Sequence, residues 1–154
     1  MRQYTKKRAA ANRIAQGTRR SLVAQHEDGG CWVCGYSSKR PNPALPLKLS
    51  KLCCHELGAC NGGLRGKSQG DARFLLVVCF WCNQHEVGDK SKWPEVRQLA
   101  LKLARDPETY DLLAYLKHTR PAALERISEA DVASWLSLLP VRRFAGRYQD
   151  WRTL

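Results

Sequence analysis

Four cysteines, arranged as two pairs, are the residues whose type and spacing most directly indicate chemistry. Cys31 and Cys34 form one Cys-x-x-Cys pair, and Cys79 and Cys82 form a second. Thiolates at this spacing converge on one metal ion, and four of them complete the tetrahedral shell that Zn²⁺ prefers. A shell closed by four sulfurs leaves no position for a substrate. The sequence therefore predicts a structural zinc site.

Three further cysteines, Cys53, Cys54 and Cys60, lie between the two pairs, close enough in sequence to compete as ligands. The total of seven is odd, and the first residues of the chain contain no apolar stretch typical of a signal peptide. Both facts favour zinc in a reducing compartment over disulfide bonds. A redox pair and buried free thiols are the alternatives.

A second group of polar residues lies between and just after the cysteine pairs. His55 and Glu56 follow residues 47–52, whose alternation of apolar and polar side chains predicts a half-buried strand. The apolar run 74–78 predicts a second strand, which leads into the second cysteine pair. Asn83 comes directly after that pair, where we expect a helix to begin and to carry it in the first turn. This order brings an imidazole, a carboxylate and an amide oxygen toward one place.

These three groups suit the hydrolysis of a phosphodiester bond. The reaction needs a general base that deprotonates water. It also needs a hard divalent cation that neutralises the charge developing on the phosphorus-bound oxygens and the leaving oxygen. Oxygen and imidazole ligands suit such an ion.

The charge of the chain indicates a polyanionic partner, with nucleic acid as the first candidate. Its 154 residues include 26 Lys and Arg against 14 Asp and Glu, a net charge of +12. Residues 1–20 contain no acidic residue and predict a flexible or nascent-helical arm that lies along phosphates, followed by a short helical turn over 21–28. A glycine-rich loop over 58–71 is also basic. The candidate nucleic-acid-binding residues are Arg2, Lys6, Lys7, Arg8, Arg13, Arg19, Arg20, Arg65 and Lys67.

The remainder of the chain has apolar residues at helical spacing and predicts three helices. We expect a basic arm over 1–20, a zinc-bound core over 21–90 and a helical region over 91–154 that packs on the core or follows it. The tail over 141–154 is basic and aromatic, and either contacts nucleic acid or packs on the body. The longest apolar run, 74–82, is too short to span a bilayer, so no membrane association is expected.

At the cysteine pairs, His55 and Asn83, the sequence resembles the HNH (His-Me finger, ββα-metal) endonucleases, over roughly residues 28–90. It looks closest to the zinc-stapled type found in phages and some bacteria, and is similar in pattern to the recombination endonuclease VII family. These proteins share a Cys-x-x-Cys pair, a His-containing pair at a strand end, an apolar strand, and a second Cys-x-x-Cys followed by Asn or His. The resemblance implies an α+β fold: a small zinc-stapled ββα-metal core with a basic N-terminal arm and C-terminal helices.

The resemblance also implies a function, a metal-dependent endonuclease that hydrolyses DNA in the cytoplasm of a bacterial cell or a phage-infected host. His55 would activate water, and Asn83 would bind a catalytic Mg²⁺ or Mn²⁺. Two registers stay open: His55 as base with Cys54 in the place of a metal ligand, or His55 as metal ligand with Glu56 as base. His85 is either a further ligand or a surface histidine.

The sequence departs from the family in two ways, and both keep other functions open. The strand-end pair is often His-His or Asp-His in the family, and many members carry an Asn at the start of the second strand, where residues 71–74 have none. One alternative is a non-catalytic zinc-knuckle protein that binds nucleic acid through its arm. Another is a small scaffold that binds a protein partner through its C-terminal helices. Both a monomer and a homodimer are compatible with the sequence.

Overall fold

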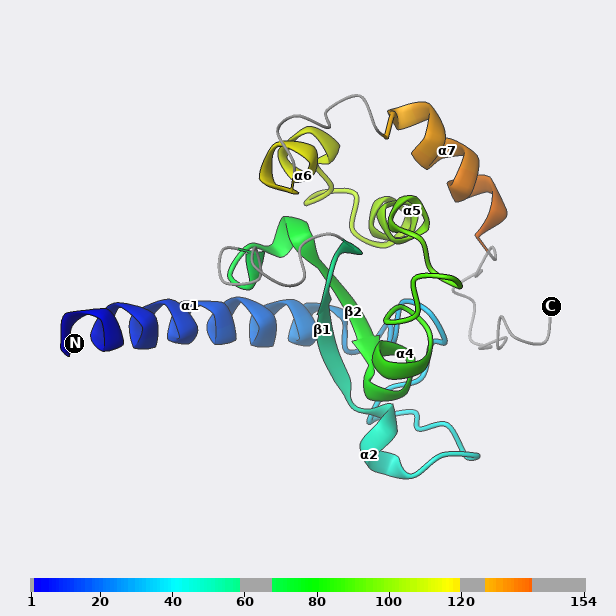
Figure 1. Cartoon of the computed structure of the whole chain (residues 1–154). Coiled ribbons are helices and arrows are strands. Elements are labelled where there is room, and N and C mark those ends of the chain that lie inside the picture. Colours follow the sequence, from blue (N-terminus) through cyan, green and yellow to red (C-terminus); the bar gives the residue numbers. More distant parts are fainter. Residues whose placement is uncertain (1, 59–67, 120–126, 140–154) are drawn as a thin grey trace.

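A computed structural model of the chain describes residues 2–58, 68–119 and 127–139, with backbone alone for 2–5 (Figure 1). The expectations for Cys60, Arg65, Lys67 and the tail over 141–154 lie outside these residues, as does the side chain of Arg2. The fold is α+β, with helices around a two-stranded antiparallel sheet. The elements are α1 (Arg2–His26), α2 (Leu47–Ser50), β1 (Leu52–Glu56), the 3₁₀ turn η3 (Ala72–Phe74), β2 (Leu75–Cys79), α4 (Phe80–His85), α5 (Glu95–Arg105), α6 (Leu112–Thr119) and α7 (Glu129–Leu138).

The N-terminal segment is one continuous helix of 25 residues, α1. This agrees with the helical alternative for residues 1–20 and not with the flexible one, and the helix continues through the turn expected over 21–28. Three alanines over 9–11 favour helix, and no proline interrupts the segment. Ala15 and Leu22, two helical turns apart, are buried against the body and anchor the C-terminal half. The N-terminal half extends away from the body (Figure 1). The packing of Ala15 and Leu22 against the body was not predicted from the sequence.

The two strands form the hairpin-like sheet at the centre of the fold, with His55 opposite Leu76 and Glu56 opposite Leu75. The strand predicted over 47–52 is wrong. Pro46 precedes a helical turn there, α2, and the strand begins at Leu52. Strand pairing requires a partner, and β2 offers one only to residues 52–56. His55 and Glu56 therefore lie within a strand and are fixed by its register, rather than following it.

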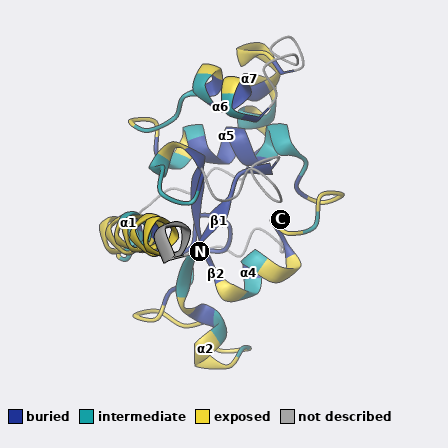
Figure 2. Ribbon diagram, turned by 60° about the vertical axis from the view of Figure 1, so that its left-hand side comes forward, coloured by how far each residue is buried: buried dark blue, intermediate teal, exposed yellow. Residues whose placement is uncertain are grey.

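Helices cover both faces of this sheet. Figure 2 shows α1 and α4 on opposite sides of the two strands. Every residue of β2 is buried, in agreement with the continuous apolar run in its sequence. The sheet is thus the middle layer of a small three-layer core.

The C-terminal helices pack on this core and share its apolar interior. Trp93, Leu99 and Tyr115 are buried in the same cluster as the strands, and α7 packs against α5. Ser128 caps α7 through a reciprocal pair of hydrogen bonds with Asp131. None of the helices in the described part of the chain combines the length and apolar character needed to cross a membrane.

Candidate metal centre and strand-end site

The first cysteine pair lies in a tight turn that is joined to the sheet. The Cys31 carbonyl oxygen accepts a hydrogen bond from the Gly35 N–H at 2.8 Å, and the Trp32 N–H donates to the Val77 carbonyl of β2 at 2.9 Å. Gly30 has a φ of +70°, and a Cβ at this position would lie 2.2 Å from the Gly35 carbonyl oxygen. Only glycine fits both requirements. The turn is therefore fixed at its entrance and along β2.

The second pair lies where β2 ends and α4 begins. The Cys82 N–H points at the sulfur of Cys79, the N-cap residue, at 3.4 Å. The first pair repeats this contact, with the Cys34 N–H 3.4 Å from the sulfur of Cys31. In both turns a backbone donor faces the first sulfur, an arrangement that stabilises a thiolate.

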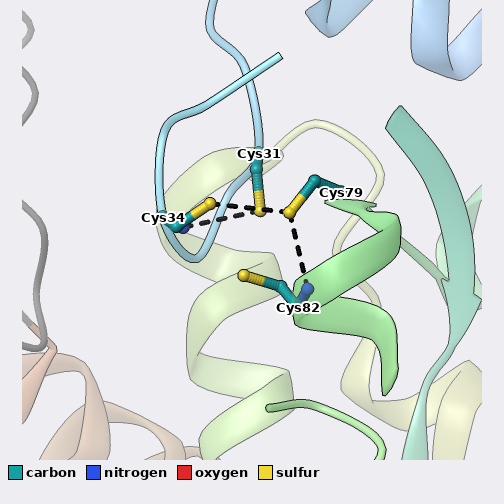
Figure 3. Close-up of side chains that lie close together, drawn as sticks. All are labelled: Cys31, Cys34, Cys79 and Cys82. Carbon is teal, nitrogen blue, oxygen red and sulfur yellow. Dashed lines mark hydrogen bonds between the residues drawn. The ribbon is translucent and has the colours of Figure 1, made fainter. Parts of the chain in front are cut away.

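The four sulfurs converge, as the spacing predicted (Figure 3). All four cysteines are buried, and their sulfur atoms lie within 4.8 Å of one another. A tetrahedral zinc site with Zn–S bonds of about 2.3 Å has sulfur–sulfur separations of about 3.8 Å, and Cys34 and Cys79 have their sulfurs 3.6 Å apart. Burial raises the pKa of the Cys31 thiol, but hydrogen bonds from the other three cysteines outweigh it and hold that pKa well below its usual range. The cluster could hold one structural metal ion such as zinc.

The neighbouring cysteines of β1 do not join this cluster. Burial raises the pKa of Cys53 to about 12 and that of Cys54 to about 11. Cys54 also directs its sulfur toward the Arg19 carbonyl of α1 at 3.7 Å. Both side chains are therefore neutral thiols at physiological pH.

The structure brings His55 and Asn83 together, as the order of the motifs predicted. His55 Nδ1 lies 2.7 Å from Asn83 Oδ1. Asn83 follows Cys82 on α4, so the sulfur cluster fixes the start of the helix that carries it. Burial lowers the pKa of His55, although the contact with Asn83 and the charge of Glu56 oppose this change. His55 is therefore neutral at pH 7. Its Nε2 atom is buried without a hydrogen-bond partner among the described residues.

Glu56 lies on the other face of β1. Successive side chains of a strand point to opposite faces, so His55 faces α4 whereas Cys54 and Glu56 face α1. The carboxylate of Glu56 is buried and forms an ion pair with Arg19 of α1. The expected convergence of Glu56 with His55 and Asn83 is therefore wrong. The cause is the strand register, which separates adjacent residues.

His85 also lies away from the site. It is two residues beyond Asn83 on α4, about 200° around the helix axis. Its exposed ring packs against Trp81, with ring centroids 3.9 Å apart. Within the described ranges, His55 belongs to no group of three or more His, Cys, Asp and Glu side chains that could hold a metal ion.

The basic residues of α1 divide into two groups. Lys6, Lys7, Arg8, Arg13 and Arg20 are exposed, as expected of nucleic-acid-binding residues. Arg19 is instead committed to Glu56. The sequence does carry a signal for this difference, because Arg19 shares a helix face with the buried residues Ala15 and Leu22.

A scan against protein-family models gave no match, and searches of curated proteins and of solved structures gave no significant match.

Proposed function

We propose that this protein is a metal-dependent endonuclease of the HNH type, which hydrolyses DNA phosphodiester bonds. The observation that carries the proposal is the 2.7 Å contact between His55 and Asn83, made across a β–β–α unit. The four-cysteine cluster lies beside this contact and fixes the helix start. The charge of +12 supports a polyanionic substrate.

The cysteine cluster is proposed to hold Zn²⁺ as a structural ion. Four thiolates satisfy the tetrahedral preference of zinc and leave no open position. Its role is mechanical: it joins the first turn to the start of α4 and thereby sets the position of Asn83.

His55 is proposed as the general base. The amide oxygen of Asn83 is an acceptor, so Nδ1 of the neutral imidazole donates to it and carries the proton. Nε2 then keeps a lone pair, and it can take a proton from water once water or the substrate reaches this buried atom. Asn83 fixes this tautomer and the orientation of the His55 ring. Many HNH proteins orient their catalytic histidine with an Asn at the start of the second strand, and this chain has none over residues 71–74. The ion pair of Glu56 with Arg19 argues against Glu56 as the base.

A catalytic Mg²⁺ or Mn²⁺ fits this site in part. The Asn83 oxygen has a second lone pair, and an amide oxygen suits such ions. When bound, the cation supplies neutralisation of charge on the phosphodiester oxygens. The ion would depend on water and substrate oxygens for its remaining ligands, because among the described residues His55 belongs to no group of three or more His, Cys, Asp and Glu side chains that could hold a metal.

This shortage of ligands favours one alternative, a non-catalytic zinc-knuckle protein that binds nucleic acid through α1. The alternative keeps the zinc and the exposed cations, but gives His55 no role in chemistry.

Plasmid nicking separates the two functions. Supercoiled DNA is incubated with the protein in Mg²⁺, in Mn²⁺ or without added divalent ions, and His55→Ala is compared with His85→Ala as the matched control. The proposal predicts metal-dependent nicking, a loss of about 100-fold or more in His55→Ala, and a wild-type rate in His85→Ala. Equal rates in the wild type and His55→Ala under every metal condition would overturn it, provided that both proteins contain zinc and have the same circular dichroism.

A further inference from the structure

The N-terminal half of α1 is a helix without a partner in the described structure. Each residue from 6 to 14 is exposed, and the first buried position is Ala15. Figure 1 shows this half of the helix extending well beyond the sheet. A helix of this length has marginal stability in water by itself. A binding partner on its surface would stabilise it.

The chemistry of this surface selects a polyanion. Lys6, Lys7, Arg8 and Arg13 lie on it, and α1 contains no acidic residue. Ile14 is the one large apolar side chain among residues 6–14. A helix that binds a membrane surface, or an apolar groove of another protein, carries a continuous apolar face. This half of α1 has none.

The shape of the surface fits the major groove of duplex DNA. The 13 residues from 2 to 14 span about 20 Å, and the groove, about 12 Å wide, admits an α-helix. Ala9, Ala10 and Ala11 keep the helix narrow and let its backbone approach the groove closely. Lys6, Arg13 and Arg20 are spaced by two turns, so they line one side at intervals of about 10 Å and can reach phosphates.

The helix is held at a set angle to the sheet. Thr18 donates a hydrogen bond to the Gly70 carbonyl at 3.2 Å, and Leu22 is buried in the core. Arg19 pairs with Glu56, the residue adjacent to His55 in β1. The anchored half of α1 is therefore joined to the strand that carries the proposed base.

We propose that residues 2–14 of α1 dock as a preformed helix in the major groove of duplex DNA. The inference concerns binding rather than cleavage, and it rests on the proposed function only for the choice of DNA as the polyanion. It replaces a flexible arm, which would bind single strands and duplexes alike, with a rigid element that prefers duplex.

The test measures fluorescence anisotropy of a labelled 20-base-pair duplex and of the corresponding single strand, without added divalent ions. All proteins carry His55→Ala, so that no strand is cut. One variant replaces Lys6, Lys7, Arg8 and Arg13 by Gln. A second, Ala10→Pro, keeps every charge but breaks the helix ahead of its anchor. Ala10→Ser is the matched control that retains the helix.

The parent protein is expected to bind duplex at least about tenfold more tightly than single strand, because a preformed helix loses little entropy on docking. The Gln variant should reduce the slope of log K against log salt by about 3 to 4, the value for four lost phosphate contacts. Ala10→Pro should weaken duplex binding by about tenfold or more, and Ala10→Ser should match the parent.

Three results would each overturn the inference: unchanged duplex binding in Ala10→Pro, an unchanged salt slope in the Gln variant, or equal binding of single strand and duplex. Tighter binding to vesicles of anionic phospholipid than to duplex would also overturn it. Zinc content and circular dichroism confirm that the body of each variant is folded. If α1 binds duplex but the wild type does not nick plasmid, the proposed function fails and this inference stands.

Discussion

Lys102 of α5 is the most deeply buried charge in the described structure, and its replacement by Met has a predictable cost. Its side chain has 0% exposure, and Nζ lies 2.6 Å from Asp106 Oδ2 and 2.8 Å from the Ala72 carbonyl oxygen. It also lies 5.3 Å from the centroid of the Trp32 ring, beside the first cysteine turn. One ammonium group thus contacts α5, the 3₁₀ turn before β2 and the first cysteine turn.

Lys102→Met keeps the length of the side chain but removes the charge. The Asp106 carboxylate then stays buried with its bond from Thr109 as its remaining side-chain partner among those identified. Leaving one charge of a buried pair uncompensated costs about 3–5 kcal/mol. The Ala72 carbonyl keeps its hydrogen bond from the Leu75 N–H and adds little to this cost. Most single domains have a total stability of about 5–15 kcal/mol. We therefore expect Lys102→Met to lose a large part of the free energy of unfolding.

The pH dependence of this loss provides a sharper check. In the wild type, burial raises the pKa of Asp106, but hydrogen bonds from Lys102 and Thr109 outweigh it, and the pKa lies below 3.8. The pair therefore contributes stability above that pH, and loses it as the pH falls through the folded-state pKa. Without the hydrogen bond and charge of Lys102, less opposes the effect of burial, and we expect the pKa of the Asp106 carboxyl to rise. The variant then regains stability as the pH falls, so the difference between the two proteins should narrow from pH 7.5 to pH 5.

Urea denaturation of both proteins at the two pH values, with equal zinc content confirmed by elemental analysis, measures this difference. Lys117→Met on the exposed side of α6 is the control, expected to change stability by less than about 0.5 kcal/mol. A loss below about 1 kcal/mol in Lys102→Met, or a difference that does not narrow at pH 5, would refute this account of the pair.

Three other predictions concern the turns and the strand-end site. Cys34→Ser should abolish zinc binding and cooperative thermal unfolding, measured by elemental analysis and circular dichroism, whereas Cys53→Ser, outside the cluster, should retain both. Gly30→Ala should cost about 1–3 kcal/mol through its left-handed backbone, whereas Gly17→Ala, in open space within α1, should stabilise by about 0.5–1 kcal/mol in urea titrations. Glu56→Gln should retain plasmid nicking within about tenfold, and a loss as large as that of His55→Ala would identify the carboxylate as the base.

The local features of the site could be predicted from the sequence because short spacings encode them. Cys-x-x-Cys pairs fold into turns whatever the rest of the chain does, so the sulfur cluster followed from the pattern. Asn83 follows Cys82 directly, and its approach to His55 followed from the position of the second pair. The apolar run of β2 was equally clear, because a strand buried on both faces needs apolar side chains throughout.

The features that were not predicted depend on contacts between distant segments. The pair of Arg19 and Glu56 spans 37 residues. The helix face of Arg19 indicates that this side chain is covered, but no local pattern indicates Glu56 as its partner. That pair, the strand boundary at Leu52 and the burial of Lys102 all depend on which segment packs opposite. The anchoring of α1 belongs to the same group, since it depends on burial of Ala15 and Leu22 against the body.

The contacts between the end of α1 and the first cysteine turn link the direction of the helix to the four-cysteine cluster. The Gly30 N–H donates to the His26 carbonyl at 3.0 Å, and the His26 ring packs edge-on against Trp32 with centroids 5.0 Å apart. The C-terminal end of α1 is thus joined to the turn that carries Cys31 and Cys34. A tilt of the helix by about 10° about Ala15, where its free half begins, would displace the N-terminal end by about 3 Å over the free length of about 20 Å. If α1 docks on duplex DNA as proposed, that displacement is close to the rise of one base pair, so the cysteine turn and the other anchors of α1 together limit how precisely the helix is placed.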